Sequence, residues 1–302
     1  MTKIFKQLAR HWAACLAVAA LLIVQAYCDL SLPDYTSKIV DVGIQQGGIE
    51  SSVPYTVRDT TLQALELLMT EDEAALADQW YSGPDADGLR YLSKDADTAA
   101  AELESAFTTP DVVLYMAAAQ NAARVAGSTE TVTPTIYDLD AVSQQFAAMA
   151  QAPGAREMLQ NQLAGALSQL DGTVADNLAS QAVLLVSLEY EAQGIAHDVQ
   201  IAYLLRIGGQ MLGLTLLMVA AAVAVGFIAS RVSAAIGRDL RRKVFSTVVG
   251  YSNAEIEKFS TASLITRTTN DIQQVQFVCV ILLRMVAYAP ILGIGGIMHV
   301  AS

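Results

Sequence analysis

Charged residues are scarce in this sequence: Asp, Glu, Lys and Arg make up only 16% of the 302 residues, whereas 53% are hydrophobic. A soluble domain usually has about a quarter charged residues. The apolar residues gather in three runs, each long enough to cross a hydrocarbon core of about 30 Å as a helix: Trp12–Leu32, Ile207–Ala229 and Phe277–Ala301. The sequence therefore predicts an all-α membrane protein with three transmembrane helices.

Cysteine is almost as scarce, and all three residues, Cys15, Cys28 and Cys279, lie in the apolar segments. The region between the first two runs has none, so disulfides cannot stabilise it. His197 is its only histidine, with no second ligand at zinc spacing, and we expect it on a solvent-facing helix surface. The sequence predicts neither a metal site nor a catalytic site in this chain.

Basic residues are rare in residues 45–200, which hold 23 Asp or Glu against 5 Lys or Arg, a difference of −18. The chain has a net charge of −12, so the rest sums to +6. An acidic domain without a basic stripe is a poor partner for nucleic acid. We interpret the acidity as a solvated surface.

The positive charges that are present predict an orientation, since basic residues favour the cytoplasmic side. Lys3, Lys6 and Arg10 precede the first run, and residues 231–276 carry seven basic against four acidic residues. The amino terminus is then cytoplasmic in the plasma membrane, and residues 45–200 are extracellular. A cleavable signal peptide is the alternative for the first run, but no small-x-small cleavage site follows it promptly.

These boundaries divide the chain into five parts. We expect a first transmembrane helix with its outer extension at 1–44, an extracytoplasmic helical domain at 45–200 and a second transmembrane helix at 201–230. A cytoplasmic loop at 231–276 and a third transmembrane helix at 277–302 follow.

The extracytoplasmic domain is expected to be helical throughout, without competing strands. Thr70 and Glu73 form a capping box, and Thr109–Pro110 is typical of a helix start. The predicted helices are Ala74–Tyr81, Asp111–Val125, Ala155–Leu170 and Val174–Tyr190.

The cytoplasmic loop carries the most informative pattern. Helical periodicity runs without proline from Ile201 to Val249, about 74 Å at 1.5 Å per residue, and stops at Gly250–Tyr251. A capping box at Ser252–Glu255 then starts a short helix that ends near Phe259. The return helix leads through Arg267 into the third run. Two long helices with a short helix across their tip would form a rigid lever whose short helix can dock on a partner.

Three segments here resemble the transmembrane domain of ABC exporters: Leu240–Phe245, Glu255–Phe259 and Ser263–Asp271. The exit of the first helix, Leu32–Gly43, resembles that family too. The likeness covers about residues 1–45 and 205–302, and the extracytoplasmic domain departs from the usual short first loop. Some subunits of heterodimeric bacterial multidrug exporters carry such an insertion.

The resemblance implies that the short helix is a coupling helix that docks on a nucleotide-binding domain. Its residues are Ser252, Asn253, Ala254, Glu255, Ile256, Glu257, Lys258 and Phe259. It also implies that Arg267 and Asp271, one helical turn apart, brace the lever; an ordinary surface pair is the alternative. Arg284, seven residues into the third run, either snorkels to the interface or lines a substrate cavity.

The resemblance further implies an exporter of drugs or amphipathic compounds, driven by ATP and Mg²⁺ bound to a nucleotide-binding domain and paired with a second, different subunit. This sequence has no Gly-x-x-x-x-Gly-Lys-Ser/Thr phosphate loop, so it binds neither itself, and we interpret it as part of a longer protein in contact with membrane lipid. A membrane sensor or chemoreceptor-like protein is the alternative, and a membrane adaptor is a third. The third apolar run and the interruption at Gly250 count against a sensor.

Overall fold

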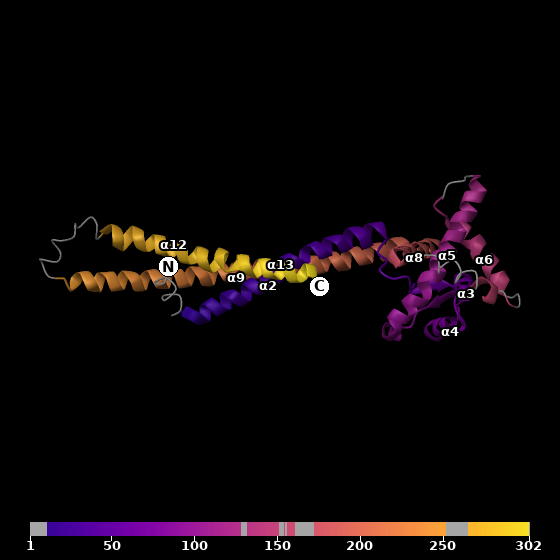
Figure 1. Cartoon of the computed structure of the whole chain (residues 1–302), viewed down its shortest axis with the longest axis horizontal. Helices are drawn as coiled ribbons and strands as arrows, with labels where there is room; N and C mark the ends of the chain where they lie inside the picture. The colour runs from indigo at the N-terminus through magenta and orange to yellow at the C-terminus, as the bar shows by residue number, and fades with distance from the viewer. Residues whose placement is uncertain are drawn as a thin grey trace. The chain divides into compact units, whose positions relative to one another are not determined.

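The computed structural model describes residues 11–127, 132–150, 154, 156–160, 172–251 and 265–301, with only the backbone for 172–179 and 267. The chain divides into two compact units. The first, here called the membrane unit, comprises Met1–Thr36 and Gly208–Ser302. The second, called the outer unit after the extracytoplasmic position that the sequence predicts for it, comprises Ser37–Ile207. Figure 1 identifies the elements of both, and each unit is described by itself.

The membrane unit is built from three helical runs. Helix α2 spans Trp12–Lys38 and α9 spans Ala196–Val249. The third run is composed of α12 (Ile272–Ile281), the π-helical turn η5 (Leu282–Val286) and α13 (Tyr288–Ala301). All three are long and apolar enough to cross a membrane. The predicted all-α membrane fold is confirmed.

Helix α9 is a single element of 54 residues, about 80 Å at 1.5 Å per residue. It begins five residues before the predicted start and ends at Val249 as predicted. The chain turns after it through bonds from Gly250 N to Thr247 O (3.2 Å) and from Tyr251 N to Val248 O (3.2 Å). Residues 196–207 of α9 belong to the outer unit and residues 208–249 to the membrane unit.

Two apolar clusters hold the membrane helices together. One joins Val18 and Leu22 of α2 to Val225 of α9. The other centres on α9 and the third run and contains Ala229, Val232, Ile236, Cys279 and Leu283. Apolar packing in a membrane gains little from water exclusion and depends on side-chain fit.

Pro290 is accommodated by the local helix geometry. It is the third residue of α13, so its missing N–H falls among the first backbone donors, which have no partner within the helix. The π-helical turn η5 lies just before it, and Ala287 N donates to Leu282 O at 3.2 Å, five residues back. Such turns often accompany disturbed helical pairing.

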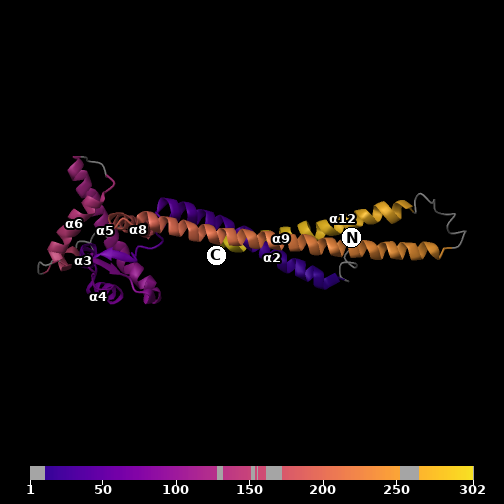
Figure 2. The same cartoon turned by 180° about the vertical axis from the view of Figure 1, so that it is seen from behind.

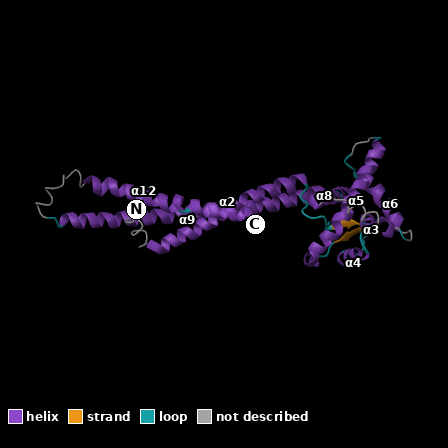
Figure 3. Ribbon diagram, viewed as in Figure 1, coloured by secondary structure: helices purple, strands orange, loops and turns teal. Residues whose placement is uncertain are grey.

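The outer unit is mainly helical, but the expectation of helix throughout is wrong. Strands β1 (Thr56–Arg58) and β2 (Leu89–Tyr91) form an antiparallel pair in which Val57 faces Arg90 (Figure 3). Three residues are too few for an alternating pattern to stand out in the sequence. Tertiary contacts, not local preference, therefore fix this pair.

The helices of the outer unit are α3 (Asp59–Leu68), α4 (Glu71–Trp80), α5 (Ala100–Ala126), α6 (Ile136–Ala150) and α8 (Gly172–Ala192). A 3₁₀ turn, η3, spans Lys94–Ala99 before α5. A π-helical segment, η2, spans Ile39–Gln45 and extends α2. The predicted helix Val174–Tyr190 lies within α8, whereas most of Ala155–Leu170 lies outside the described residues.

The capping box before α4 is confirmed. Glu73 N donates to Thr70 Oγ1 at 3.3 Å, and Thr70 N donates to the Glu73 carboxylate at 2.9 Å. Each side chain satisfies an end amide of the other, which ends the preceding turn and starts the helix.

The predicted helix start at Thr109–Pro110 is wrong, because α5 begins at Ala100 and contains Pro110 in its interior. Proline there removes one helical hydrogen bond. In the turn before it, Thr108 Oγ1 donates to Glu104 O at 2.6 Å, and Ser52 Oγ lies 3.2 Å from the same hydroxyl. Side-chain hydroxyls thus supply polar contacts in this turn.

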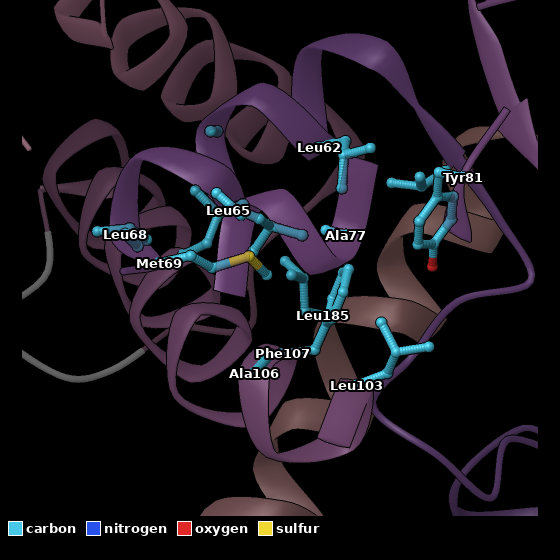
Figure 4. Close-up of a cluster of buried hydrophobic side chains, with 14 of the residues drawn as sticks. Leu62, Leu65, Leu68, Met69, Ala77, Tyr81, Leu103, Ala106, Phe107 and Leu185 are labelled. Atoms are coloured by element: carbon cyan, nitrogen blue, oxygen red, sulfur yellow. The ribbon is translucent and has the colours of Figure 1, made fainter. Parts of the chain in front are cut away.

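A continuous apolar core lies between α3, α4, α5, α6 and α8 of the outer unit (Figure 4). Its largest fully buried side chains include Leu62, Leu65, Met69, Leu103 and Phe107. No cysteine contributes to this core, so apolar burial stabilises the unit without disulfides, as the composition predicts.

Candidate functional site

The predicted coupling helix, Ser252–Phe259, lies outside the described residues, so its geometry stays a prediction. The structure does describe the two helices that lead to it. Helix α9 ends at Val249, and after Tyr251 the described residues resume at Ile265. Figures 1 and 2 both show α9 and α12 running side by side.

Arg267 and Asp271 are the two ends of η4, a π-helical turn that spans Arg267–Asp271. Asp271 is exposed, and the side chain of Arg267 lies outside the described set. The predicted ion pair between them therefore stays a prediction.

Arg284 lies in the π-helical turn η5, and its side chain is exposed in the membrane unit, next to the exposed Met285. The two predicted roles of Arg284, snorkelling to the interface and lining a cavity, stay predictions.

Sequence reasoning missed a polar contact between α9 and α12 that the structure makes explicit. Ser233 Oγ donates to the backbone oxygen of Gln276 at 2.7 Å, and Gln276 Nε2 lies 3.4 Å from Ser233 O. Arg241 donates to Gln276 Oε1 at 3.3 Å. One side chain thus binds two positions of α9 that lie eight residues apart.

Gly237 lies between these two positions and makes room for Gln276. A Cβ placed on Gly237 would lie 2.7 Å from Gln276 Cγ, and closer still to the carboxamide. Real Cβ atoms do not approach carbon so closely, so any larger residue at position 237 would displace the Gln276 side chain from its path across α9. Ser233, Gly237, Arg241 and Gln276 are called the Gln276 clasp below. A glycine within a long helix was the only signal in the sequence that could have indicated it.

A second polar contact joins α2 to α13. The Tyr288 hydroxyl donates to the Asp29 carboxylate, and His299 Nε2 lies 3.2 Å from Asp34 Oδ2. Both acidic residues of α2 therefore face polar groups of the third run, which lowers the cost of placing them within a membrane helix.

The segment around η2 also packs closely against the start of α9. Gln200 Nε2 of α9 donates to Gly43 O at 2.9 Å, and the Tyr203 hydroxyl donates to Glu50 at 2.9 Å. Gly48 has φ +82° and lies so close to Tyr203 that a Cβ would be 2.9 Å from the tyrosine Cβ. These contacts fix η2 against the start of α9.

Inside the outer unit, one arginine serves two acidic side chains. Arg58 binds Asp140 and makes a second ion pair with Glu189 at 2.9 Å. Glu189 is 1% exposed and also accepts from Thr61 Oγ1 at 2.9 Å. A buried carboxylate with this many donors is fully satisfied, and the network ties β1 and α3 to α8.

Asp111 of α5 lacks such partners. Its side chain is 0% exposed, and neither carboxylate oxygen has a hydrogen-bond partner among the described residues. Burial raises the pKa of Asp111 well above its usual range, and the negative charge of Glu189 raises it further. We infer that Asp111 is protonated when the unit is folded.

A hollow of about 900 Å³ on the outer unit is lined by residues of α3, α4 and α6 together with Gly154, Arg156, Glu157 and Gln160. Glu66 lies at its wall, and Arg156 donates to Glu66 O at 3.0 Å. Burial raises the pKa of Glu66 to about 7, with the charge of Asp78 adding to the effect. Among the described residues, no group of three His, Cys, Asp or Glu side chains could hold a metal ion.

No family model matches the chain, and no solved structure matches it either. It is 35% identical over 124 residues to "Uncharacterized ABC transporter ATP-binding protein MT1311" of Mycobacterium tuberculosis (strain CDC 1551 / Oshkosh). It is 39% identical over 90 residues to "Uncharacterized ABC transporter ATP-binding protein YfiB" of Bacillus subtilis (strain 168). These matches cover 41% and 30% of this chain, but only 21% and 16% of the two relatives. With the three apolar helices, they support a transporter role in general.

Proposed function

We propose that this chain is the amino-terminal half of the membrane domain of an ABC exporter. The observation that carries the proposal is the length of α9. This helix has 54 residues, far more than a bilayer needs, and it leads to a segment whose sequence resembles a coupling helix. Relatives named as ABC transporter ATP-binding proteins support the same interpretation.

In this proposal, ATP and Mg²⁺ bind to a nucleotide-binding domain, not to this chain. Closure of two such domains moves the coupling helix, Ser252–Phe259, and α9 and α12 transmit that motion to the membrane helices. The substrate cavity between the membrane helices then switches from facing the cytoplasm to facing the outside. The substrates are drugs or other amphipathic compounds, and the second subunit is a different chain.

The proposal places the outer unit outside the cell and the tip of α9 in the cytoplasm. Single cysteines at exposed positions test this, because the native Cys15, Cys28 and Cys279 lie in the membrane helices. Asp87→Cys should react with a membrane-impermeant maleimide in intact cells, and Arg242→Cys only after permeabilisation. The opposite pattern would contradict the orientation.

The exporter role is tested on the whole gene product with its partner subunit. The coding sequence beyond Ser302 should contain three more apolar runs and then a phosphate loop, and vesicles should export a cationic dye only with ATP. Cytoplasmic heptads in place of those runs would favour the sensor alternative. Arg284→Leu should lower dye transport at normal expression if Arg284 lines the cavity, whereas unchanged transport would remove that role.

A further inference from the structure

The Gln276 clasp lies alongside the apolar cluster that joins α9 to the third run. That cluster includes Val232, Ile236 and Cys279. Beyond Arg241 toward the tip, α9 has exposed residues such as Phe245 and Val249. Within the part of the chain that the structure describes, the clasp joins α9 to α12 by directional polar contacts.

The geometry of the clasp fixes register as well as distance. Apolar packing depends on side-chain fit but does not join one specific atom of a helix to one specific atom of its neighbour. The two bonds between Ser233 and Gln276 join specific atoms of facing helices, and Gly237 admits one side chain at one height. A shift of either helix by one residue, about 1.5 Å, would break both bonds.

The bond from Arg241 adds a charged donor to the same carboxamide. Hydrogen bonds with one ionised member contribute more than neutral ones. Gln276 is half-buried, so water competes with these bonds only in part. The side chain is held from both ends of the same stretch of α9.

We propose that Gln276 is a positioning residue that makes α9 and α12 move as one lever. This inference rests on the proposed exporter function: it assigns to Ser233, Gly237, Arg241 and Gln276 the task of carrying motion from the coupling segment to the membrane helices without slippage. Loss of the clasp leaves ATP hydrolysis in place and uncouples it from transport.

The test uses the full-length transporter with its partner subunit in lipid nanodiscs. Gln276→Leu removes the polar contacts at similar size, and Gly237→Ala displaces the side chain without removing it. Ser233→Ala removes one bond and serves if the other variants fold poorly. Gln274→Leu is the matched control, because Gln274 is an exposed glutamine on the same helix.

Two readouts separate a positioning role from a structural one. Hydrogen exchange of α12 amides in Ile272–Ile281 should become about tenfold faster in Gln276→Leu and Gly237→Ala, the factor that corresponds to about 1.4 kcal/mol. The transport of dye per ATP hydrolysed should fall severalfold, with basal ATPase activity retained. Gln274→Leu should change neither.

Unchanged hydrogen exchange would overturn the clasp, and faster exchange with normal transport per ATP would overturn its positioning role. Wild-type protein that hydrolyses no ATP and transports nothing would overturn the proposed function and the coupling role with it. The exchange experiment would still decide separately whether Gln276 joins the two helices.

Discussion

Replacing Asp111 by asparagine should stabilise the outer unit at neutral pH. The wild-type carboxyl is fully buried with both oxygens unpartnered, and Glu189 lies close enough for its charge to raise the pKa of Asp111. In the unfolded chain the same carboxyl has a pKa of about 3.9 and ionises freely. Folding at pH 7 therefore requires Asp111 to take up a proton.

The size of this penalty follows from the distance between the working pH and the unfolded pKa. Each pH unit costs about 1.4 kcal/mol for as long as the folded carboxyl stays neutral, so about three units give an upper bound of about 4 kcal/mol at pH 7. Asparagine has almost the same shape and needs no proton. Its own buried amide keeps part of the desolvation cost, so we expect a gain of about 1–4 kcal/mol.

The sign of the pH dependence is specific. Because the folded pKa of Asp111 is raised, the folded state binds more protons than the unfolded one, and its contribution to stability is lost as pH rises above about 4. The advantage of Asp111→Asn over wild type should therefore grow as pH rises from 5.5 to 7.5. Glu66, with a pKa of about 7, titrates in both proteins and cancels in the difference.

The fluorescence of Trp80, which packs against the core of the outer unit, reports its unfolding in urea. A Trp12→Phe background removes the other tryptophan from the signal, because the chain has two. Asp87→Asn, at an exposed position, is the control and should stay within about 0.5 kcal/mol of wild type. An Asp111→Asn protein that is less stable than wild type at pH 7, or whose advantage is the same at both pH values, would refute the reasoning.

Three further substitutions in the outer unit can be followed by the same urea titration. Arg58→Met should cost about 3–5 kcal/mol, because it leaves Glu189 buried without its cation; a cost below about 1 kcal/mol would contradict the network. Thr70→Ala should cost about 1 kcal/mol by removing the helix cap, with an unchanged stability counting against it. Gly48→Ala should lower the free energy of unfolding more than Gly47→Ala does. Both glycines have positive φ, but only at Gly48 would a Cβ collide with backbone and side-chain atoms. Equal losses of stability would show that backbone strain alone matters.

The sequence predicts those features that depend on neighbouring residues alone. The capping box at Thr70 needs only two side chains three residues apart, and it is present in the structure. The end of α9 at Val249 needs only the loss of helical periodicity before Gly250. Apolar run length is equally local, which is why the three membrane helices could be placed before any tertiary contact was known.

Features that depend on distant partners escaped prediction. The start of α5 was placed at Pro110 because proline favours the first turn, yet contacts with Ser52, some 56 residues away from Thr108, accompany a proline inside the helix. Strand β1 gains its form from pairing with β2, more than thirty residues later. In both cases a nonlocal contact outweighs a local preference of at most a few kcal/mol.

The candidate site divides in the same way. The capping box at Ser252 predicts a short helix from neighbouring residues alone, and the resemblance to ABC exporters implies its coupling role. The Gln276 clasp could not be predicted, because the meaning of Gly237 depends on the side chain that fills the space of its absent Cβ, and that side chain comes from another helix.

The distribution of polar contacts within the membrane unit limits how its helices can move. Apolar clusters join the three runs. Among the described residues, directional contacts include the Gln276 clasp between α9 and α12 and the pairs of Asp29 and Asp34 with α13. A rearrangement that separates α2 from the third run must break the contact of Asp29 with Tyr288, but it can leave the clasp intact. A rearrangement of α9 against α12 must break the clasp first. If the chain works as the proposed exporter, a motion that keeps α9 and α12 together leaves the clasp intact, and this favours a lever that moves as a pair of helices.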